Sequence, residues 1–162
     1  MLNNTQEAIE ANIYVHSSMV DEYNDSPHFN VENQKKVKST LDNLIKGLPT
    51  KNLKLIDFGC GTGFIIDLVK DKFTEIRGVD VTQAMLDKVD LSSNNIYLSN
   101  CPAEDTPFLD NSFDMATAYS FMDHLVDYKA LLKEGHRVLK PEGIFYIDLN
   151  PNRHFWSSLE NA

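Results

Sequence analysis

The sequence predicts an α/β fold in which helices cover both faces of one mainly parallel sheet. Short apolar runs of strand length alternate along the chain with segments whose apolar residues recur at helical spacing. Glycine and proline residues stand where these segments end, and we find no internal repeat or interdomain linker. Parallel strands joined by helices wind with right-handed crossovers, so the sheet is expected to lie between two helical layers.

The first element expected is a helix with one buried face, which ends near Gly47 and Pro49. Its apolar stripe consists of Val37, Leu41, Leu44, Ile45 and Leu48. The period then changes, and residues 53–58 are predicted to form a buried strand that a glycine-rich loop ends. An apolar helix follows from Phe64 to about Lys70.

The same order of strand and helix repeats in the second half. Strands are predicted at residues 75–80, about 95–99, 113–119 and 143–149. Thr82 is expected to cap a short helix after the second of the five strands. A longer helix from Tyr128 to Leu139 should precede the fifth strand, because Lys140-Pro141-Glu142-Gly143 breaks it.

Composition excludes several classes of protein. The chain has 162 residues and a formal net charge of -9, which argues against nucleic acid as a partner. The longest apolar stretch is too short to cross a membrane. Two cysteines and no signal-peptide pattern predict reduced thiols in the cytoplasm. We expect a single domain, with a helical cap and the first sheet-covering helix in residues 1–50 and a ligand-binding core in 51–162.

The loop from Gly59 to Gly63 and the acid that follows it predict a nucleoside ligand. Glycines between a buried strand and a helix let a ligand approach the backbone. Asp80 ends the next strand, roughly 20 residues after Gly59, where a carboxylate can accept from both ribose hydroxyls. Phe64 stands where the dinucleotide fingerprint has its third glycine, which disfavours a pyrophosphate. The alternative is structural, with glycines that only turn the chain and an Asp that only caps a helix.

Four ordered motifs resemble those of the class I S-adenosylmethionine-dependent methyltransferases of the small-molecule type. They read LIDFGCGTG, GVDVTQAML, AEDTPFLDNSFDMATAYSFMDHL and HRVLKPEGIFYIDLNP. The resemblance extends from about Tyr14 to Pro151. It implies a Rossmann-like three-layer α/β/α sandwich with strand order 3-2-1-4-5, a small-molecule acceptor, and S-adenosylmethionine as cofactor with S-adenosylhomocysteine as product.

The resemblance also implies which residues bind the cofactor. The positions that match are Asp57, Gly59, Cys60, Gly61 and Gly63 for the methionine part, Asp80 for the ribose, Val81, Ala103 and Glu104 for the adenine, and Ala118 and Tyr119 beside the methyl group. Tyr14 is expected to touch the methionine carboxylate from an N-terminal helical lid, unless that helix only packs. The family often has an Asp where this chain has Pro102, and Glu104 is the hypothetical substitute.

Methyl transfer is a single in-line displacement, so positioning the acceptor can supply most of the catalysis. If the acceptor must lose a proton, Asp123 and His124 are the candidate bases by motif position. The alternative is that Asp123 caps a helix and His124 serves a turn. The scattered histidines predict no metal site. Phe155 and Trp156 are expected either to wall the acceptor pocket or to cover the sheet.

The family sheet has seven strands, and the last two are expected to be missing from this sequence. A fifth strand at the sheet edge would leave backbone groups unpaired, which predicts self-association through that edge. Three functions therefore stay open. They are an active small-molecule methyltransferase, a cofactor-binding subunit that is inactive or completed by a partner, and an NAD-dependent oxidoreductase, which the glycine pattern disfavours.

Overall fold

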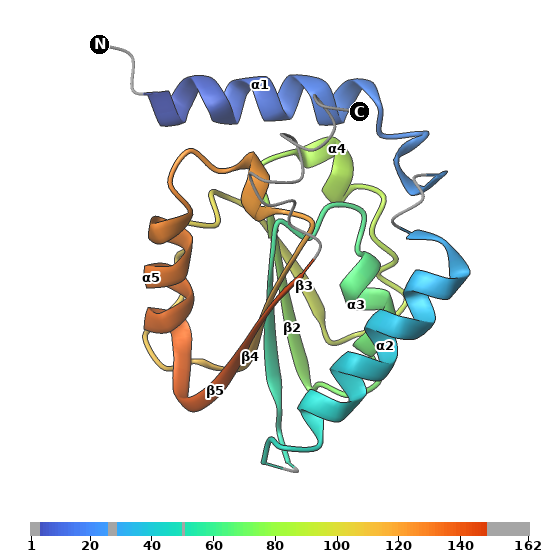
Figure 1. Ribbon diagram of the computed structural model, residues 1–162, viewed down its shortest axis with the longest axis vertical. Helices are drawn as coiled ribbons and strands as arrows, with labels where there is room; N and C mark the ends of the chain where they lie inside the picture. Colours follow the sequence, from blue (N-terminus) through green and yellow to red (C-terminus); the bar gives the residue numbers. More distant parts are fainter. Residues whose placement is uncertain (1–3, 26–28, 50, 149–162) are drawn as a thin grey trace, which may run out of the picture.

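A computed structural model of the chain describes residues 4–25, 29–49 and 51–148. Its centre is one parallel sheet in the order β3-β2-β1-β4-β5 (Figure 1). The strands are β1 (Lys54–Phe58), β2 (Glu75–Asp80), β3 (Ile96–Asn100), β4 (Phe113–Tyr119) and β5 (Leu139–Asp148). The predicted fold class and strand order are confirmed.

Helices lie on both faces of the sheet and across one end of it. They are α1 (Asn4–Ser18), α2 (Val31–Ile45), α3 (Phe64–Val69), α4 (Gln83–Leu86) and α5 (Tyr128–Val138), with single 3-10 turns η1 (Tyr23–Asp25) and η3 (Met122–His124). In Figure 1, α2 and α3 cover one face of the sheet and α5 covers the other, so the molecule has the three layers that the sequence predicts.

Two apolar clusters form the core, one on each face of the sheet. On one face Val37 and Leu41 of α2 meet Ile66 of α3, and on the other Leu131 and Val138 of α5 meet the sheet. All seven residues of β4 are buried, because this strand has neighbours on both sides and helices on both faces. The apolar stripe predicted for α2 therefore packs as expected.

The junction between α5 and β5 corrects one prediction. Leu139 was expected to end the helix and the strand was expected from Gly143, whereas the helix ends at Val138 and Leu139 already pairs with Phe113 of β4. Lys140 precedes Pro141, and a residue before proline favours extended backbone. The residues that were expected to form a turn lie within β5 instead. The β4–β5 pairing is irregular there, and Glu142 has a φ of 65°.

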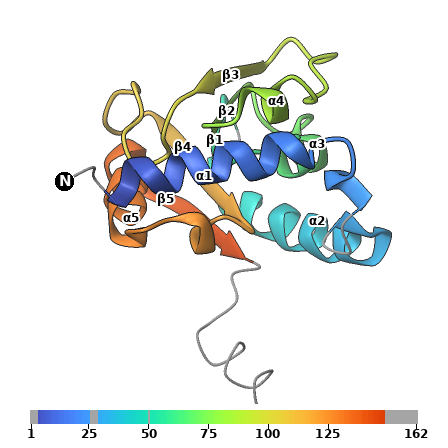
Figure 2. The same ribbon diagram turned by 90° about the horizontal axis from the view of Figure 1, so that it is seen from above.

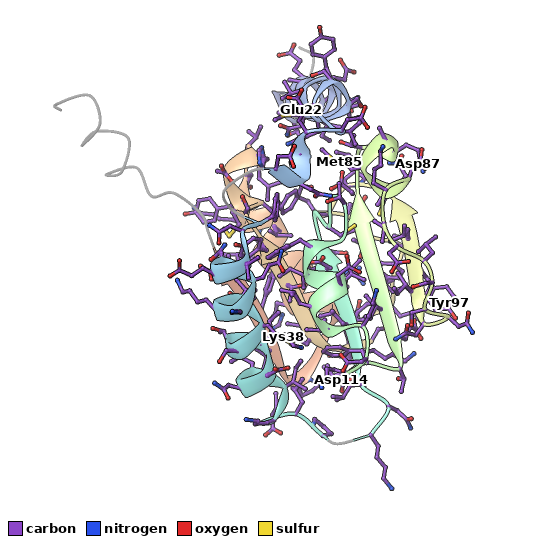
Figure 3. All side chains as sticks on the ribbon, turned by 90° about the vertical axis from the view of Figure 1, so that its right-hand side faces the viewer. Glu22, Lys38, Met85, Asp87, Tyr97 and Asp114 are labelled. Carbon is purple, nitrogen blue, oxygen red and sulfur yellow. The ribbon has the colours of Figure 1, made fainter. Side chains whose placement is uncertain are left out.

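The amino ends of three strands are fastened by one carboxylate. Asp114, at the start of β4, accepts a hydrogen bond of 2.9 Å from the backbone N–H of Lys54 at the start of β1. The ammonium of Lys140 in β5 lies 2.8 and 2.9 Å from its two oxygens. Figure 3 shows Asp114 at the end of the molecule opposite Met85 and Asp87. These contacts link β1, β4 and β5 at the end of the sheet away from α4.

The other end of the sheet, where the strands finish, is crossed by α1. Figure 2 shows α1 lying over the sheet, with α4 beside it. Within the three described ranges, no helix combines the length and apolar character needed to cross a membrane. Phe155 and Trp156 lie outside the described residues. The space between α1 and the strand ends is where the candidate site lies.

Candidate active site

Three adjacent cavities lie over the ends of the central strands, and Gly59 lines all of them. Counted together with the solvent at their mouths, they take up about 400, 400 and 290 Å³. The first contains Ala103 and Glu104 and is called the β3-side cavity. The second lies against Asp80 and Thr82 and is called the middle cavity. The third contains Asp57 and Tyr119 and is called the β4-side cavity.

The loop after β1 forms the floor of these cavities and depends on glycine at two positions. Gly59 has a φ of 65°, and a Cβ atom there would lie 2.1 Å from the ring of Phe121. Gly61 has a φ of 53° and lies under the ring of Tyr23. L-residues rarely adopt this left-handed backbone, and a side chain at Gly59 would collide with Phe121, so the loop needs glycine where the chain turns and aromatic rings approach it.

Asp80 ties the glycine loop to α4. One carboxylate oxygen accepts from the backbone N–H of Gly61 at 3.0 Å, and the other accepts from that of Thr82 at 2.8 Å. A carboxylate has about four acceptor positions, so each oxygen can accept one further hydrogen bond. Asp80 is half-buried and borders both the β3-side and middle cavities. It is therefore fixed by backbone donors with acceptor capacity left for a ligand.

Asp57 is a buried carboxyl group, with only 2% of its surface exposed. Burial raises its pKa to about 7, and the negative charge of Asp80 adds to this, while a hydrogen bond from the Thr117 hydroxyl at 2.6 Å opposes it. Asp57 lines the β4-side cavity. A cationic group placed there would compensate the carboxylate, so this end of the site favours an ammonium.

The β3-side cavity is suited to a flat apolar ring with a polar edge. Val81, Ala103 and Glu104 line it, as the resemblance implied for adenine, and Thr5, Ala8 and Ile9 of α1 form its outer wall. Pro102 is exposed. Glu104 lines this cavity together with Asp80, and its suggested role as a substitute acceptor stays a prediction.

The remaining cofactor candidates fall into two groups. Cys60 and Tyr119 line the β4-side cavity, where Phe64 stacks on Tyr119 with ring centres 5.0 Å apart. Burial raises the pKa of the Cys60 thiol well above its usual value, so the thiol stays protonated. Ala118 is fully buried in the core, and Gly63 begins α3 in a left-handed conformation. Contact of these two with a ligand stays a prediction.

A larger and more open hollow lies beside these three, and takes up about 1320 Å³ when the solvent at its mouth is included. We call it the open cavity. It shares His16, Tyr23, Ser120 and His124 with the middle cavity. Asp123 also lines it, and its carboxylate oxygen lies 3.9 Å from Nε2 of His124. The two candidate bases therefore lie in the wall between the glycine-loop cavities and open space.

The structure places Tyr14 apart from the other candidates. Its side chain is 77% exposed and borders a separate depression on α1 with Glu10 and Ser17. The N-terminal lid instead reaches the site through Asn12, His16 and Tyr23. None of these three was assigned to the site from the sequence. A helical stripe of residues four apart, from Asn12 to His16, was the signal available.

Phe121 is a site residue that sequence reasoning missed. Its ring lies over Gly59 and borders both the β3-side and the middle cavity. The position two residues after a strand that ends at the site was the available indication. Apolar side chains in such loops usually belong to the core, so the residue type does not distinguish a core residue from a residue that lines a site.

Thr82 stands at the predicted N-cap of α4, but its side chain makes no capping hydrogen bond. Its hydroxyl oxygen is buried and has no hydrogen-bond partner among the residues that the structure describes. An unpaired buried hydroxyl is costly unless a ligand or water completes it. Since Thr82 lines the middle cavity, this unpaired group indicates a polar ligand next to Asp80.

The described side chains do not form the groups of ligands that hold metal ions in proteins. Within the part of the chain that the structure describes, no three His, Cys, Asp or Glu side chains group as a metal ion would require. The absence of a metal in the reaction stays a prediction.

Comparison with known proteins agrees with this geometry. The profile of a family described as a methyltransferase domain matches residues 56–147. The demethylmenaquinone methyltransferase of Staphylococcus aureus is 38% identical over 100 residues, which cover 58% of this chain and 42% of that protein. The chain thus spans less than half the length of this curated relative.

Solved structures show the same fold. YcgJ from Bacillus subtilis superposes with a TM-score of 0.59 and 28% identity, over 67% of this chain and 49% of that one. The [4+2]-cyclase SpnF gives a TM-score of 0.69 with 22% identity, over 86% and 59% of the two chains. The likeness to SpnF concerns the fold alone.

Proposed function

We propose, because this chain belongs to the methyltransferase-domain family, that it binds S-adenosylmethionine and transfers the methyl group to a small-molecule acceptor. The observation that carries the proposal is the row of three cavities over Gly59, with Asp80 in the middle and buried Asp57 at one end. Both carboxylates have ligand-binding capacity that the protein itself does not use.

The residues present fit this cofactor. Asp80 would accept hydrogen bonds from the ribose hydroxyls, and the unpaired hydroxyl of Thr82 lies beside it in the middle cavity. The buried carboxyl of Asp57 would hold the amino group of the methionine part. Val81 and Glu104 would contact the adenine in the β3-side cavity. The glycines of the loop let the backbone turn beneath these cavities, with the ring of Phe121 packed directly against Gly59.

When bound, the cofactor supplies a methyl group activated by a sulfonium centre. The protein then has to hold an acceptor atom about 3 Å from that methyl group, in line with the leaving sulfur. The open cavity borders the middle cavity and is the space available for the acceptor. Asp123 and His124, the candidate bases predicted from the sequence, line it.

A small-molecule acceptor is supported by the shape of the site. The open cavity lies under α1 and η1 and is bounded by a few side chains from each. A relative named for demethylmenaquinone also supports it. The two cysteines are free thiols, which supports a cytoplasmic location.

Calorimetric titration tests the cofactor assignment. S-adenosylmethionine and S-adenosylhomocysteine should bind, and NAD should not. Asp80→Asn should weaken binding about tenfold or more, because a charged acceptor contributes about 1.5–3 kcal/mol. Asp71→Asn is the matched control, since Asp71 is an exposed residue beyond α3. NAD binding without S-adenosylhomocysteine binding would overturn the proposal, and binding without turnover on any acceptor would favour an inactive subunit.

A further inference from the structure

We propose that the methyl acceptor is an amine that enters as a cation, and that His16 takes its proton before methyl transfer. This rests on the proposed function and names the substrate class and a further catalytic residue for the same site. The observation behind it is the wall of the open cavity, where an imidazole from α1 meets the imidazole of His124 among carboxylates and aromatic rings.

Position is the first argument for His16. It lines both the middle cavity and the open cavity, so it borders the cofactor and the acceptor. Its ring centre lies 5.0 Å from that of His124 and 5.9 Å from that of Tyr23. α1 is held in this place by Asn12, whose side-chain amide donates to the carbonyl oxygen of His124 at 3.0 Å.

Protonation state is the second argument. Burial lowers the pKa of His16, and the charge of His124 lowers it further, against smaller opposing effects of Asp80, the Asn12 backbone and Asp123. Burial raises the pKa of Tyr23 to about 12, helped by Asp80, Asp123 and Cys60. At neutral pH the imidazole of His16 is therefore uncharged and able to accept a proton, whereas the phenol of Tyr23 keeps its own.

The lining of the open cavity indicates the charge of the acceptor. Glu22, Asp25 and Asp123 contribute three carboxylates, and no Lys or Arg is among the described residues that line it. The rings of Tyr23 and Phe29 lie 5.3 Å apart beside them. Carboxylates attract a cation, and aromatic faces bind ammonium groups. An acceptor with a carboxylate or phosphate would be repelled.

The proton has to leave before the nitrogen can react, because an ammonium has no free electron pair. The N–H proton passes to the unprotonated ring nitrogen of His16, which becomes an imidazolium and later releases the proton to water. The nitrogen lone pair then forms the new bond to the methyl carbon, and the electrons of the broken bond stay with sulfur. Charge and atoms balance without a further reactant.

Binding to the S-adenosylhomocysteine complex tests the charge of the acceptor. The probes are 2-phenylethylamine, 2-phenylethanol and 3-phenylpropanoate, which share a ring and differ in charge. The amine should bind at least tenfold tighter than either of the others by calorimetry. Asp123→Asn should weaken the binding of 2-phenylethylamine severalfold, and the control Asp71→Asn should leave it unchanged. Equal or tighter binding of the alcohol or the carboxylate would overturn the inference.

Turnover tests His16. Formation of S-adenosylhomocysteine is measured with 2-phenylethylamine, tyramine and histamine. At saturating S-adenosylmethionine, which removes the pH dependence of cofactor binding, His16→Asn should lower kcat about 100-fold, as expected for loss of a general base, and should abolish the fall of kcat/KM for the amine on the acid side. Affinity for 2-phenylethylamine should change less than threefold. His136→Asn is the matched control, since His136 is exposed on α5.

Two results overturn this inference while leaving the cofactor assignment intact. One is S-adenosylhomocysteine binding with no turnover of any of the three amines. The other is a His16→Asn variant with unchanged kcat and an unchanged pH profile. If S-adenosylhomocysteine itself does not bind, the proposed function fails, and the inference fails with it.

Discussion

Asp57 is a carboxyl group in the β4-side cavity whose pKa lies near neutral pH. Its pKa is raised to about 7 by burial, so below that pH the free protein holds a neutral carboxyl group there. An ammonium ligand binds the carboxylate form, and protonation competes with it. The affinity for the cofactor is therefore linked to pH through this one residue.

We expect the affinity for S-adenosylmethionine to rise between about pH 6 and 8, with a limiting slope of tenfold per pH unit below the pKa of Asp57. Asp57→Asn should bind more weakly and with less dependence on pH, because an amide does not ionise. Calorimetric titrations at both pH values check this. A pH dependence that is the same in the wild type and the variant would contradict the assignment.

That some candidate residues lie close together could be predicted from the chain order. Asp57 and Asp80 lie at the carboxyl ends of β1 and β2, and Gly59 follows β1 directly. Parallel strands bring these ends to one edge of the sheet. His16 and Phe121 could not be assigned in this way. Their roles depend on how α1 crosses the sheet and on the loop after β4, which no periodicity in the sequence records.

At the scale of elements, the strands were predictable because their apolar runs are short and end at glycine, proline or other turn residues. The boundary of β5 was not, since Leu139 fits the apolar stripe of α5 as well as the start of a strand. Pro141 decides between them by favouring extended backbone before it. The boundary between α5 and β5 therefore depends on both local propensity and pairing with β4. The sequence shows the propensity but not the pairing.

Asp114 should act on stability alone. Asp114→Ala leaves the N–H of Lys54 without its acceptor and Lys140 without its ion pair, which should lower the free energy of unfolding by about 2 kcal/mol. Urea denaturation measures this. Asp71→Ala, which breaks an exposed pair with Lys72, should cost less than about 0.5 kcal/mol.

The affinity of Asp114→Ala for S-adenosylhomocysteine should match the wild type, because the side chain lies at the opposite end of the molecule from α4 (Figure 3). A large loss of affinity with little loss of stability would show instead that the contacts of Asp114 shape the cavities over Gly59.

At the scale of the whole molecule, the sheet is covered unevenly. β4 is buried along its length, whereas in the described part of the chain β5 borders β4 alone and is mostly half-buried or exposed. A strand edge of this kind is a template for pairing with another chain. Self-association through β5 thus stays a proposal that the sequence made and the topology supports.

Sedimentation velocity from about 1 to 100 µM should reveal this as a rising average mass, with a dissociation constant in the micromolar range. An unchanging mass of 18.4 kDa over that range would contradict it.

The hydrogen bond from Asn12 to the carbonyl of His124 joins residues 112 positions apart. At ribosomal rates of about 5–20 residues per second, a stretch of 112 residues takes roughly 6–22 s to synthesise. During that interval α1 can contact α4, which is made earlier, but not η3, which carries the carbonyl that receives Asn12. The final position of α1 over the strand ends therefore depends on a segment that is synthesised much later than the helix itself.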